Sequence, residues 1–415
     1  MNVSRLRLRR CLPAAFALLF AACGGDRDDR TVIRISGWSS SPEETRLLEA
    51  QLAEFESLRP DIKIKYEPIV GDYMQKIQVL YASRTEPDIF YLDSKDVARM
   101  VHYGVLAPLD GYLEEAGDDL TDYYEDLIET FRGEDGRLYG LPKGFSTLAL
   151  YYNKDLFEKA GIGRPPRDWR ELLDASRKLD ALGVSPLSMT TDLKTIHLFA
   201  GLWGGELLER QKRIAFLDPP SREGLAALLG LFDEESGFAK LPQHFGGAWT
   251  GDVFAKSQTA MIMEGMWVTP YLQMRSSALR YGVAPIPRKE RDYNIIFTVA
   301  YVLSSRSKHK KEAFSLVHYL TGPKGLMHVS KLGLEIPSRK SVVRKDFLAR
   351  FPERKPFIDA VDHAVPFRYG IEGNRLMEEI VKAVEARRMR QLPFDEALER
   401  ASEKLERFYE TEARP

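Results

Sequence analysis

Apolar and polar positions follow two regular patterns in the first third of the chain. Thr31–Ser36 and Ile62–Tyr66 alternate with a period of two, which predicts half-buried strands, and Pro87–Leu92 is an apolar run typical of a strand buried on both faces. Between these strands, apolar residues recur at helical spacing over Leu47–Leu58 and Met74–Leu80. This order predicts a parallel sheet with helices on both faces.

The pattern starts again in the middle of the chain. Leu138–Tyr152 is long and mostly extended, and Asp168 with Glu171 forms a capping-box-like pair at the start of a helix. Further elements are predicted as a short helix capped by Asn153, strands at Thr259–Met263, Tyr281–Ile286 and Thr298–Ser304, a helix capped by Ser307, and helices through Leu376–Val384 and Leu398–Phe408. No disordered linker separates the halves, so we expect two α/β lobes joined by strands.

The N-terminus has the pattern of an export signal. Residues 1–22 combine a cationic start with an apolar segment, Leu12–Ala22, that is too short to span a bilayer. Small residues precede Cys23, an arrangement that resembles a bacterial lipoprotein signal cut before a lipid-modified cysteine, although Phe20 replaces the usual leucine. An ordinary secretory signal with an incidental cysteine is the alternative.

Cysteine usage and charge agree with export of an anchored protein. The two cysteines, Cys11 and Cys23, both precede the predicted fold, so the mature part has no disulfide and no cysteine metal site. Residues 23–30 are polar and suit a flexible tether, with Cys23 as the lipidation point. Lys and Arg total 60 and Asp and Glu total 61, and removal of residues 1–22 takes away four arginines and leaves a net charge of −5. This balance gives no indication of nucleic-acid binding.

Motifs for catalysis are missing from the sequence. There is no G-x-S-x-G nucleophile motif, no H-E-x-x-H, no P-loop and no complete G-x-G-x-x-G. We therefore predict no catalytic residues, no metal and no cofactor. A glycan hydrolase stays open as an alternative, because its two carboxylates need no fixed spacing in the sequence.

Three tryptophans are candidates for solute binding. Trp38 and Trp267 each follow a predicted strand, and Trp249 stands in the glycine-rich loop Gly246–Gly251. Ligands of open parallel sheets bind beyond the carboxyl ends of the strands, and aromatic faces suit the C–H faces of sugars. The alternative is that these rings only fill the core.

A series of short motifs occurs along the chain in a characteristic order. They are Pro87–Ile89, Gly104–Leu109 (GVLAPL), Tyr139–Pro142 (YGLP), Leu150–Phe157 (LYYNKDLF), Ala160–Ile162, Pro165–Pro166, Asp168–Trp169, Thr259–Trp267 (TAMIMEGMW), Gly282–Pro287 (GVAPIP) and a helix at Lys311–Leu320. In this order they resemble the sugar-binding family of extracellular solute-binding proteins of bacterial ABC importers, which includes the maltose-binding protein. Phe297–Tyr301 departs from the family, which often has Gly-Gly there, so Tyr301 is expected to face the ligand.

The resemblance implies the type II periplasmic-binding-protein-like fold, with two α/β lobes that each contain a sheet flanked by helices. By position, lobe one is residues 31–145 and 300–345, and lobe two is residues 146–299 and 346–415. The hinges are expected near Lys143–Leu148 and Ile295–Val302, with a third crossing near Ser341–Phe347.

The resemblance also implies a binding site between the lobes. The expected ligand residues are Trp38, Ser39, Ser40, Glu43, Asp93 and Ser94 from lobe one, Ser146 at the hinge, Trp249 and Trp267 from lobe two, and Tyr301 and Arg368. Ser146 occupies the position of a ligand carboxylate in the maltose-binding relative, which suggests a different solute. Arg368 would hold an anionic group on the solute.

The implied function is the capture of a carbohydrate or related polyol for an ABC importer. The protein is expected to be a monomer, exported and lipid-anchored to the cell envelope, on the periplasmic side or the cell surface, and to deliver its solute to permease subunits. The solute could be a mono- or oligosaccharide, a sugar alcohol or a phosphorylated polyol. The alternatives are a lipid-anchored glycan hydrolase and a ligand-sensing partner of a membrane receptor.

Overall fold

The computed structural model describes residues 30–38, 42–209, 213–233, 237–276, 278–333, 335–371 and 373–412. Residues 1–29 lie outside this part, so the predicted signal, Cys23 and most of the tether stay predictions. Ser39 and Ser40 also lie outside the described residues.

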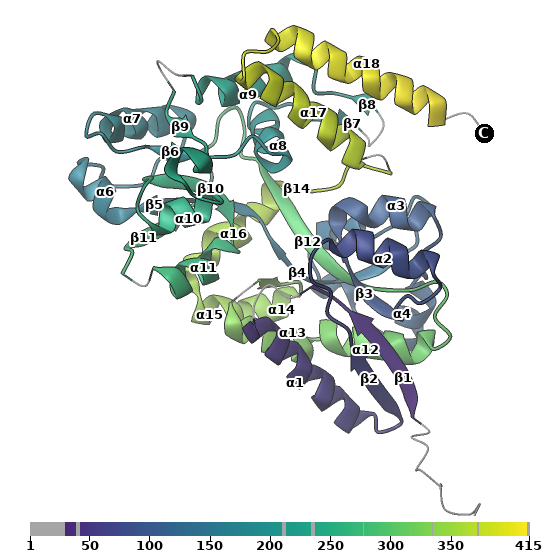
Figure 1. Ribbon diagram of the computed structural model, residues 1–415. Coiled ribbons are helices and arrows are strands. Elements are labelled where there is room, and N and C mark those ends of the chain that lie inside the picture. Colours follow the sequence, from purple (N-terminus) through teal and green to yellow (C-terminus); the bar gives the residue numbers. More distant parts are fainter. Residues whose placement is uncertain are drawn as a thin grey trace, which may run out of the picture.

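Helices and strands alternate along most of the described chain (Figure 1). The helices are α1 Pro42–Leu58, α2 Tyr73–Ala82, α3 Val97–His102, α4 Asp110–Ala116, α5 Glu125–Thr130, α6 Lys154–Lys159, α7 Trp169–Asp180, α8 Leu193–Leu202, α9 Pro219–Gly230, α10 Thr250–Ala255, α11 Val268–Arg275, α12 Lys310–Thr321, α13 Pro323–Leu332, α14 Lys340–Val342, α15 Leu348–Arg350, α16 Lys355–Asp359, α17 Gly373–Arg388 and α18 Phe394–Glu412. The strands are β1 Thr31–Ser36, β2 Ile62–Tyr66, β3 Ile89–Asp93, β4 Gly140–Ser146, β5 Leu148–Asn153, β6 Leu187–Ser188, β7 Leu208–Glu209, β8 Arg213–Ile214, β9 Ala239–Lys240, β10 Met261–Gly265, β11 Tyr281–Ala284, β12 Asn294–Leu303, β13 Ile336–Pro337 and β14 Ala364–Pro366.

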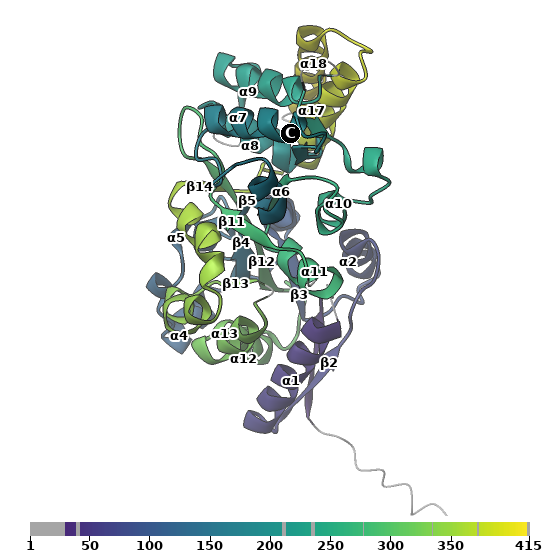
Figure 2. The ribbon, with the colours of Figure 1, turned by 90° about the vertical axis from the view of Figure 1, so that its left-hand side faces the viewer.

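The elements build two lobes, each on its own sheet (Figures 1 and 2). Lobe one is built on a seven-stranded sheet in the order β13-β4-β12-β3-β1-β2, with β14 beside β12. Lobe two is built on a five-stranded sheet in the order β11-β5-β10-β6-β9. The predicted parallel pairing is confirmed for β1 with β2 and β3, whereas β12 joins β3 and β4 in antiparallel pairs.

The local patterns explain these elements. In β1, Ile33 and Ile35 are fully buried and meet the apolar stripe of α1, which includes Leu52 and Phe55. Burial of such a stripe removes apolar surface from water and contributes most of the stability of a surface helix. Residues of β3 from Ile89 to Leu92 are buried throughout, as the apolar run predicts.

Some predicted boundaries are wrong, for local reasons. The strand predicted at Thr259–Met263 runs from Met261 to Gly265, because its pairing with β5 continues to Leu148. Ser307 does not cap the following helix, which begins at Lys310 after His309. Instead, the Ser307 hydroxyl donates to Asp88 and accepts from the His309 amide, and so closes the turn before the helix.

The chain passes between the lobes on strands and on a helical segment. β4 belongs to the first sheet and β5, which follows at once, to the second, while the long strand β12 runs from one lobe into the other (Figure 1). The third passage runs from α14 to α16 through a π-helical turn. The Asn294 side chain accepts from the Leu148 amide at 2.8 Å and donates to its carbonyl at 2.9 Å. These buried bonds tie the two crossing strands together.

A buried histidine connects three segments in lobe two. His197 on α8 is hydrogen-bonded through Nε2 to the Tyr293 hydroxyl at 2.7 Å and through Nδ1 to the Tyr369 hydroxyl. Tyr293 precedes β12 and Tyr369 follows β14, so the imidazole joins α8 to the segments that enter and leave the hinge. Burial, with a smaller effect of the nearby Arg291, lowers the pKa of His197 to about 3. The folded protein therefore holds this ring neutral.

We predict that His197 makes the protein less stable in mild acid. Between pH 6.5 and 3, His197 of the unfolded chain binds a proton, whereas His197 of the folded protein stays neutral. The contribution of this residue to the free energy of unfolding is therefore fully present above pH 6.5 and is lost as the pH falls toward 3. Denaturant unfolding measures the free energy of unfolding at pH 7 and at pH 5. From pH 7 to pH 5 this free energy should fall by about 2 kcal/mol more in the wild type than in His197→Gln. Equal losses would show that the folded protein protonates His197 normally.

Among the described helices, none combines the length and apolar character needed to cross a membrane.

Candidate functional site

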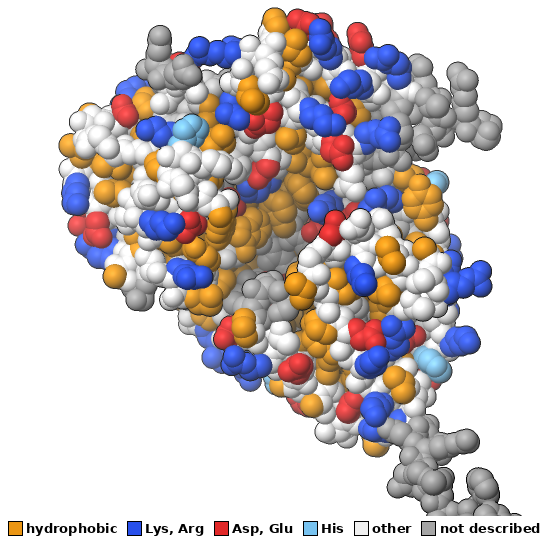
Figure 3. All heavy atoms as spheres, in the orientation of Figure 1, with side chains coloured by type: hydrophobic (Ala, Val, Ile, Leu, Met, Phe, Trp, Pro, Cys, Tyr) orange, Lys and Arg blue, Asp and Glu red, His pale blue; other side chains and the backbone are white. Residues whose placement is uncertain are grey.

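A cavity of about 370 Å³ lies between the two lobes. Figure 3 shows hydrophobic side chains gathered around the hollow between the lobes. Lobe one contributes Trp38, Glu44, Leu47, Leu48, Gln51, Tyr91, Lys143, Tyr301, Val329 and Glu335, and lobe two contributes Trp249, Trp267, Pro270, Tyr271 and Met274. Val299 lies on β12, where this strand passes from one lobe to the other. Because both lobes supply side chains, the shape of this cavity depends on how the lobes are placed.

On the side of lobe one, aromatic rings hold each other edge to face. Trp38 follows β1 and packs against Tyr73 and Tyr91, with ring centroids 4.9 and 5.3 Å apart. Tyr301 on β12 packs against Tyr91 at 5.2 Å. An added Cβ at Gly37 would lie 2.6 Å from the Tyr91 ring, so only glycine lets the backbone come this close.

On the side of lobe two, two tryptophan rings rest on glycines. An added Cβ at Gly265 would lie 2.1 Å from the Trp267 ring, and one at Gly251 would lie 2.3 Å from the Trp249 ring. Trp267 also packs edge to face on Phe297 and remains 37% exposed. Each ring therefore lies close to the backbone of a glycine, and both rings line the cavity.

Three charged side chains form an ion cluster in the wall of the cavity: Lys143, Glu44 and Glu335. The Lys143 ammonium lies 3.2 Å from a carboxylate oxygen of Glu44 and 3.1 Å from one of Glu335. It also lies 4.9 Å from the centre of the Tyr91 ring. Glu335 reaches this place because residue 144 is glycine, where a Cβ would lie 2.6 Å from the carboxylate carbon.

The ion cluster keeps Lys143 charged although it is buried. Burial alone would lower the pKa of Lys143, but the carboxylates of Glu335 and Glu44 raise this pKa well above its usual range. Burial also raises the pKa of Tyr301 to about 12, despite the opposing effect of the Lys143 ammonium, so its phenol stays protonated at neutral pH.

A second hollow, of about 420 Å³, is also lined by Trp38. Its lining is mostly polar and consists of Trp38, Asp72, Tyr73, Met74, Gln75, Gln78, Asp93, Lys95, Asp96, Arg99 and Asn374. Asn374 belongs to α17 of lobe two, so this hollow is also lined from both lobes. Burial raises the pKa of Asp93, whose carboxylate accepts from the Lys95 amide at 3.1 Å.

The structure brings four of the predicted site residues together in the 370 Å³ cavity: Trp38, Trp249, Trp267 and Tyr301. Asp93 lines the second hollow. The other predicted residues of the described chain have different surroundings.

Ser146 does not line either hollow, since its hydroxyl donates to the Thr147 carbonyl and accepts from the Met266 amide, both at 2.9 Å. Ser94 is fully buried and donates to the Phe367 carbonyl at 3.1 Å, which is a contact between the lobes. Glu43 faces solvent beside Arg46. These three residues therefore belong to the framework or the surface around the site.

Arg368 does not line the cavity between the lobes. Its guanidinium donates to the Glu129 carbonyl on α5 at 3.2 Å, and burial lowers its pKa. It lines neither of the two hollows between the lobes.

Sequence reasoning missed the ion cluster, Tyr91 and Tyr271. Lys143 and Glu335 are far apart in the sequence, and no local pattern predicts that they meet. One local pattern could have indicated how the tryptophan rings are placed. Gly265 and Gly251 each stand two residues from a tryptophan, and that tryptophan's ring lies against the glycine.

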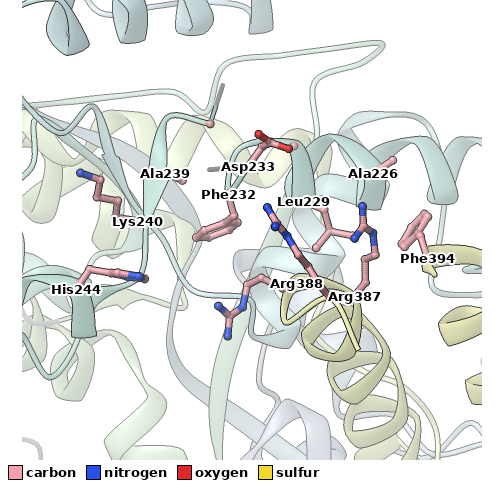
Figure 4. Close-up of a pocket in the computed structure, with 13 residues that line it drawn as sticks. Ala226, Leu229, Phe232, Asp233, Ala239, Lys240, His244, Arg387, Arg388 and Phe394 are labelled. Carbon is pink, nitrogen blue, oxygen red and sulfur yellow. The ribbon is translucent and has the colours of Figure 1, made fainter. Parts of the chain in front are cut away.

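A separate hollow of about 530 Å³ lies in lobe two and shares no lining residue with the cavity between the lobes. Figure 4 shows that Arg387 and Arg388 of α17 lie near Phe232 and Phe394 in this hollow. Arg388 is paired with Glu385 on the same helix. Within the described residues, no three His, Asp or Glu side chains form a group that could hold a metal ion.

Comparison with known proteins agrees with this architecture. A binding protein of Brucella abortus (strain 2308) is 27% identical over 281 residues, which cover 64% of this chain and 66% of that protein, just under two thirds. The galactooligosaccharide-binding protein of Bacillus subtilis (strain 168) is 24% identical over 350 residues, or 80% of each chain.

Among solved structures, the ABC substrate-binding protein Lmo0181 of Listeria monocytogenes, in complex with cycloalternan, is similar with a TM-score of 0.82. The two proteins are 23% identical, and the match covers 92% of this chain and 99% of that one. This likeness confirms the predicted fold class, that of the type II periplasmic binding proteins.

The model of one protein family matches residues 38–327, most of the chain and most of both lobes. The relatives named above are binding proteins rather than enzymes. The chain is a member of the bacterial extracellular solute-binding protein family.

Proposed function

We propose that this protein is the lipid-anchored solute-binding component of an ABC import system, which captures a carbohydrate or related polyol between its lobes and delivers it to a membrane permease. The observation that carries the proposal is the supply of aromatic rings to one cavity from both lobes: Trp38, Tyr91 and Tyr301 from one side, Trp249 and Trp267 from the other. A mostly apolar cavity with a few placed polar groups is typical of sites for small molecules.

The chemistry of the lining favours a carbohydrate. The C–H faces of a sugar ring can stack on the Trp267 and Trp249 rings, while the ion cluster of Lys143, Glu44 and Glu335 offers donors and acceptors to its hydroxyls. A site built around such hydrogen bonds rejects an analogue that lacks the hydroxyl, because a buried polar group then has no partner. The galactooligosaccharide-binding relative supports this class of solute.

Capture would work by closure of the lobes around the solute. A solute that contacts both lobes binds the closed form more tightly than the open one and so shifts the population toward closure. We assign residues 31–145 and 300–345 to one moving body and residues 146–299 and 346–415 to the other. The hydrogen bond of Ser146 with the Met266 amide then links the first hinge strand to the loop that carries Trp267.

The anchor would sit at the far end of lobe one. β1 begins directly after the predicted tether, at the end of lobe one that points away from lobe two (Figure 1). Eight residues from 23 to 30 reach at most about 28 Å when fully extended. A lipid on Cys23 would thus hold the protein at the membrane and leave the cleft free to meet solute and permease.

The competing functions differ in measurable ways. A glycan hydrolase would convert an oligosaccharide, so incubation followed by mass spectrometry should return the sugar unchanged if the protein only binds. A ligand-sensing partner of a receptor would bind the same solute but would not support its uptake by the permease.

Trp267→Ala should weaken solute binding by about 1 to 3 kcal/mol, because a buried aromatic contact is lost. A thermal-shift screen of neutral mono-, di- and trisaccharides and polyols identifies the binding sugar, and calorimetry measures its affinity. Tyr103→Ala serves as the control, since Tyr103 is 64% exposed and lines neither hollow. Unchanged affinity in Trp267→Ala would remove this ring from the site.

Gly265→Ala should weaken binding of the same sugar although it keeps the tryptophan, because the new Cβ displaces the Trp267 ring. In the Trp267→Ala background the same change should add little, since the two substitutions act on one contact. Gly111→Ala is the matched control, because a Cβ there meets open space. Independent, additive effects would contradict the support role of Gly265.

Cys23→Ala should yield a protein that is exported without acyl chains. Mass spectrometry of the native protein should detect acyl groups on Cys23 as the first residue of the mature chain. The variant should move from the membrane fraction to the soluble fraction. A native protein without acyl groups would contradict the anchor but not the binding function.

A further inference from the structure

The charged side chains that line the two hollows bear on the charge of the solute that the cleft can bind. In the cavity between the lobes, the charged lining residues are Glu44, Glu335 and Lys143, so carboxylates outnumber the cation. In the second hollow, the charged lining residues are Asp72, Asp93, Asp96, Lys95 and Arg99, and carboxylates are again in excess.

Two of the three lining cations, Lys143 and Arg99, are paired with carboxylates. Lys143 is 7% exposed and lies within 3.2 Å of both Glu44 and Glu335. Arg99 lies 2.8 Å from the Asp96 carboxylate. A phosphate or carboxylate on the solute would have to compete with these partners in a place where water is scarce.

Arg368, which was expected to hold an anionic group on the solute, lies outside both hollows. It donates to the Glu129 carbonyl and lines neither hollow. Arginine is the usual partner of a buried phosphate. Among the described residues that line the two hollows, the one arginine is Arg99, and it is paired with Asp96.

We infer that the ion cluster makes the cleft selective for an uncharged carbohydrate and excludes solutes that carry a phosphate or carboxylate. The inference rests on the proposed function and narrows its solute class. Glu44 and Glu335 are the specificity residues, because they neutralise Lys143 and repel a second anion. Selectivity of this kind is built from repulsion as much as from attraction.

The inference predicts a large preference in the wild-type protein. Burial of an anion beside two carboxylates costs several kcal/mol, so an anionic probe should bind about 100-fold or more weakly than a neutral sugar. The neutral probes are mono- to trisaccharides of glucose, galactose and mannose. The anionic probes are glucose 6-phosphate, galactose 1-phosphate and sn-glycerol 3-phosphate. Calorimetry under one buffer and salt condition measures all of them.

A gain of binding gives the sharper test. Glu335→Gln preserves the shape of the side chain but removes one of the two charges on Lys143, so the affinity for the phosphate probes should rise at least about tenfold. The quantity compared is the ratio of phosphate affinity to neutral-sugar affinity, which should rise at least about tenfold even where the new amide weakens binding of the neutral sugar. Glu378→Gln, on the exposed face of α17, makes the same change in net charge outside the cleft and should alter neither affinity.

The outcomes separate the two proposals. Wild-type protein that binds a phosphate probe as tightly as a neutral sugar, or Glu335→Gln in which the ratio of phosphate affinity to neutral-sugar affinity does not rise, overturns the charge selectivity and leaves solute capture intact. Absence of binding to every neutral sugar overturns the carbohydrate function and the selectivity together. The wild-type comparison decides the matter even where Glu335→Gln fails to fold.

Discussion

The structure of the cleft depends on a buried ammonium that must be neutralised. Lys143 comes from β4, Glu44 from α1 and Glu335 from the segment before β13, so the pairing draws three separate parts of lobe one to one point. Breaking such a buried pair leaves an uncompensated charge, which is far more costly than the pair itself is stabilising. The same cluster therefore fixes the wall of the cavity and sets the sign of its charge.

Close approach between rings and backbone is the second constraint. Trp267 lies on Gly265 and Trp249 on Gly251, while Gly37 allows the backbone before Trp38 to approach Tyr91. A ring fixed in this way loses little freedom when a solute stacks on it, because its orientation is already set in the free protein. If the proposed function holds, the rings suit the C–H faces of an uncharged sugar and the ion cluster suits its hydroxyls.

A position next to a strand end accounts for only some of the predicted residues that line the cavity between the lobes. Trp38 and Trp267, which follow β1 and β10, line one cavity. Trp249 and Tyr301 line it too, although Trp249 precedes α10 and Tyr301 lies inside the antiparallel strand β12. Ser146 was expected in the same place, but a hydroxyl in the middle of a crossing strand finds backbone partners first.

The sequence by itself determined the strands, the amphipathic helices and the family, because periodicity and the order of short motifs are local properties of the chain. β1, β3 and α7 form where the apolar pattern places them. Only the tertiary structure decided which charges meet. Lys143 and Glu335 are brought together because β13, which begins next to Glu335, pairs antiparallel with β4, which contains Lys143. No local pattern encodes a contact between residues so far apart in the chain.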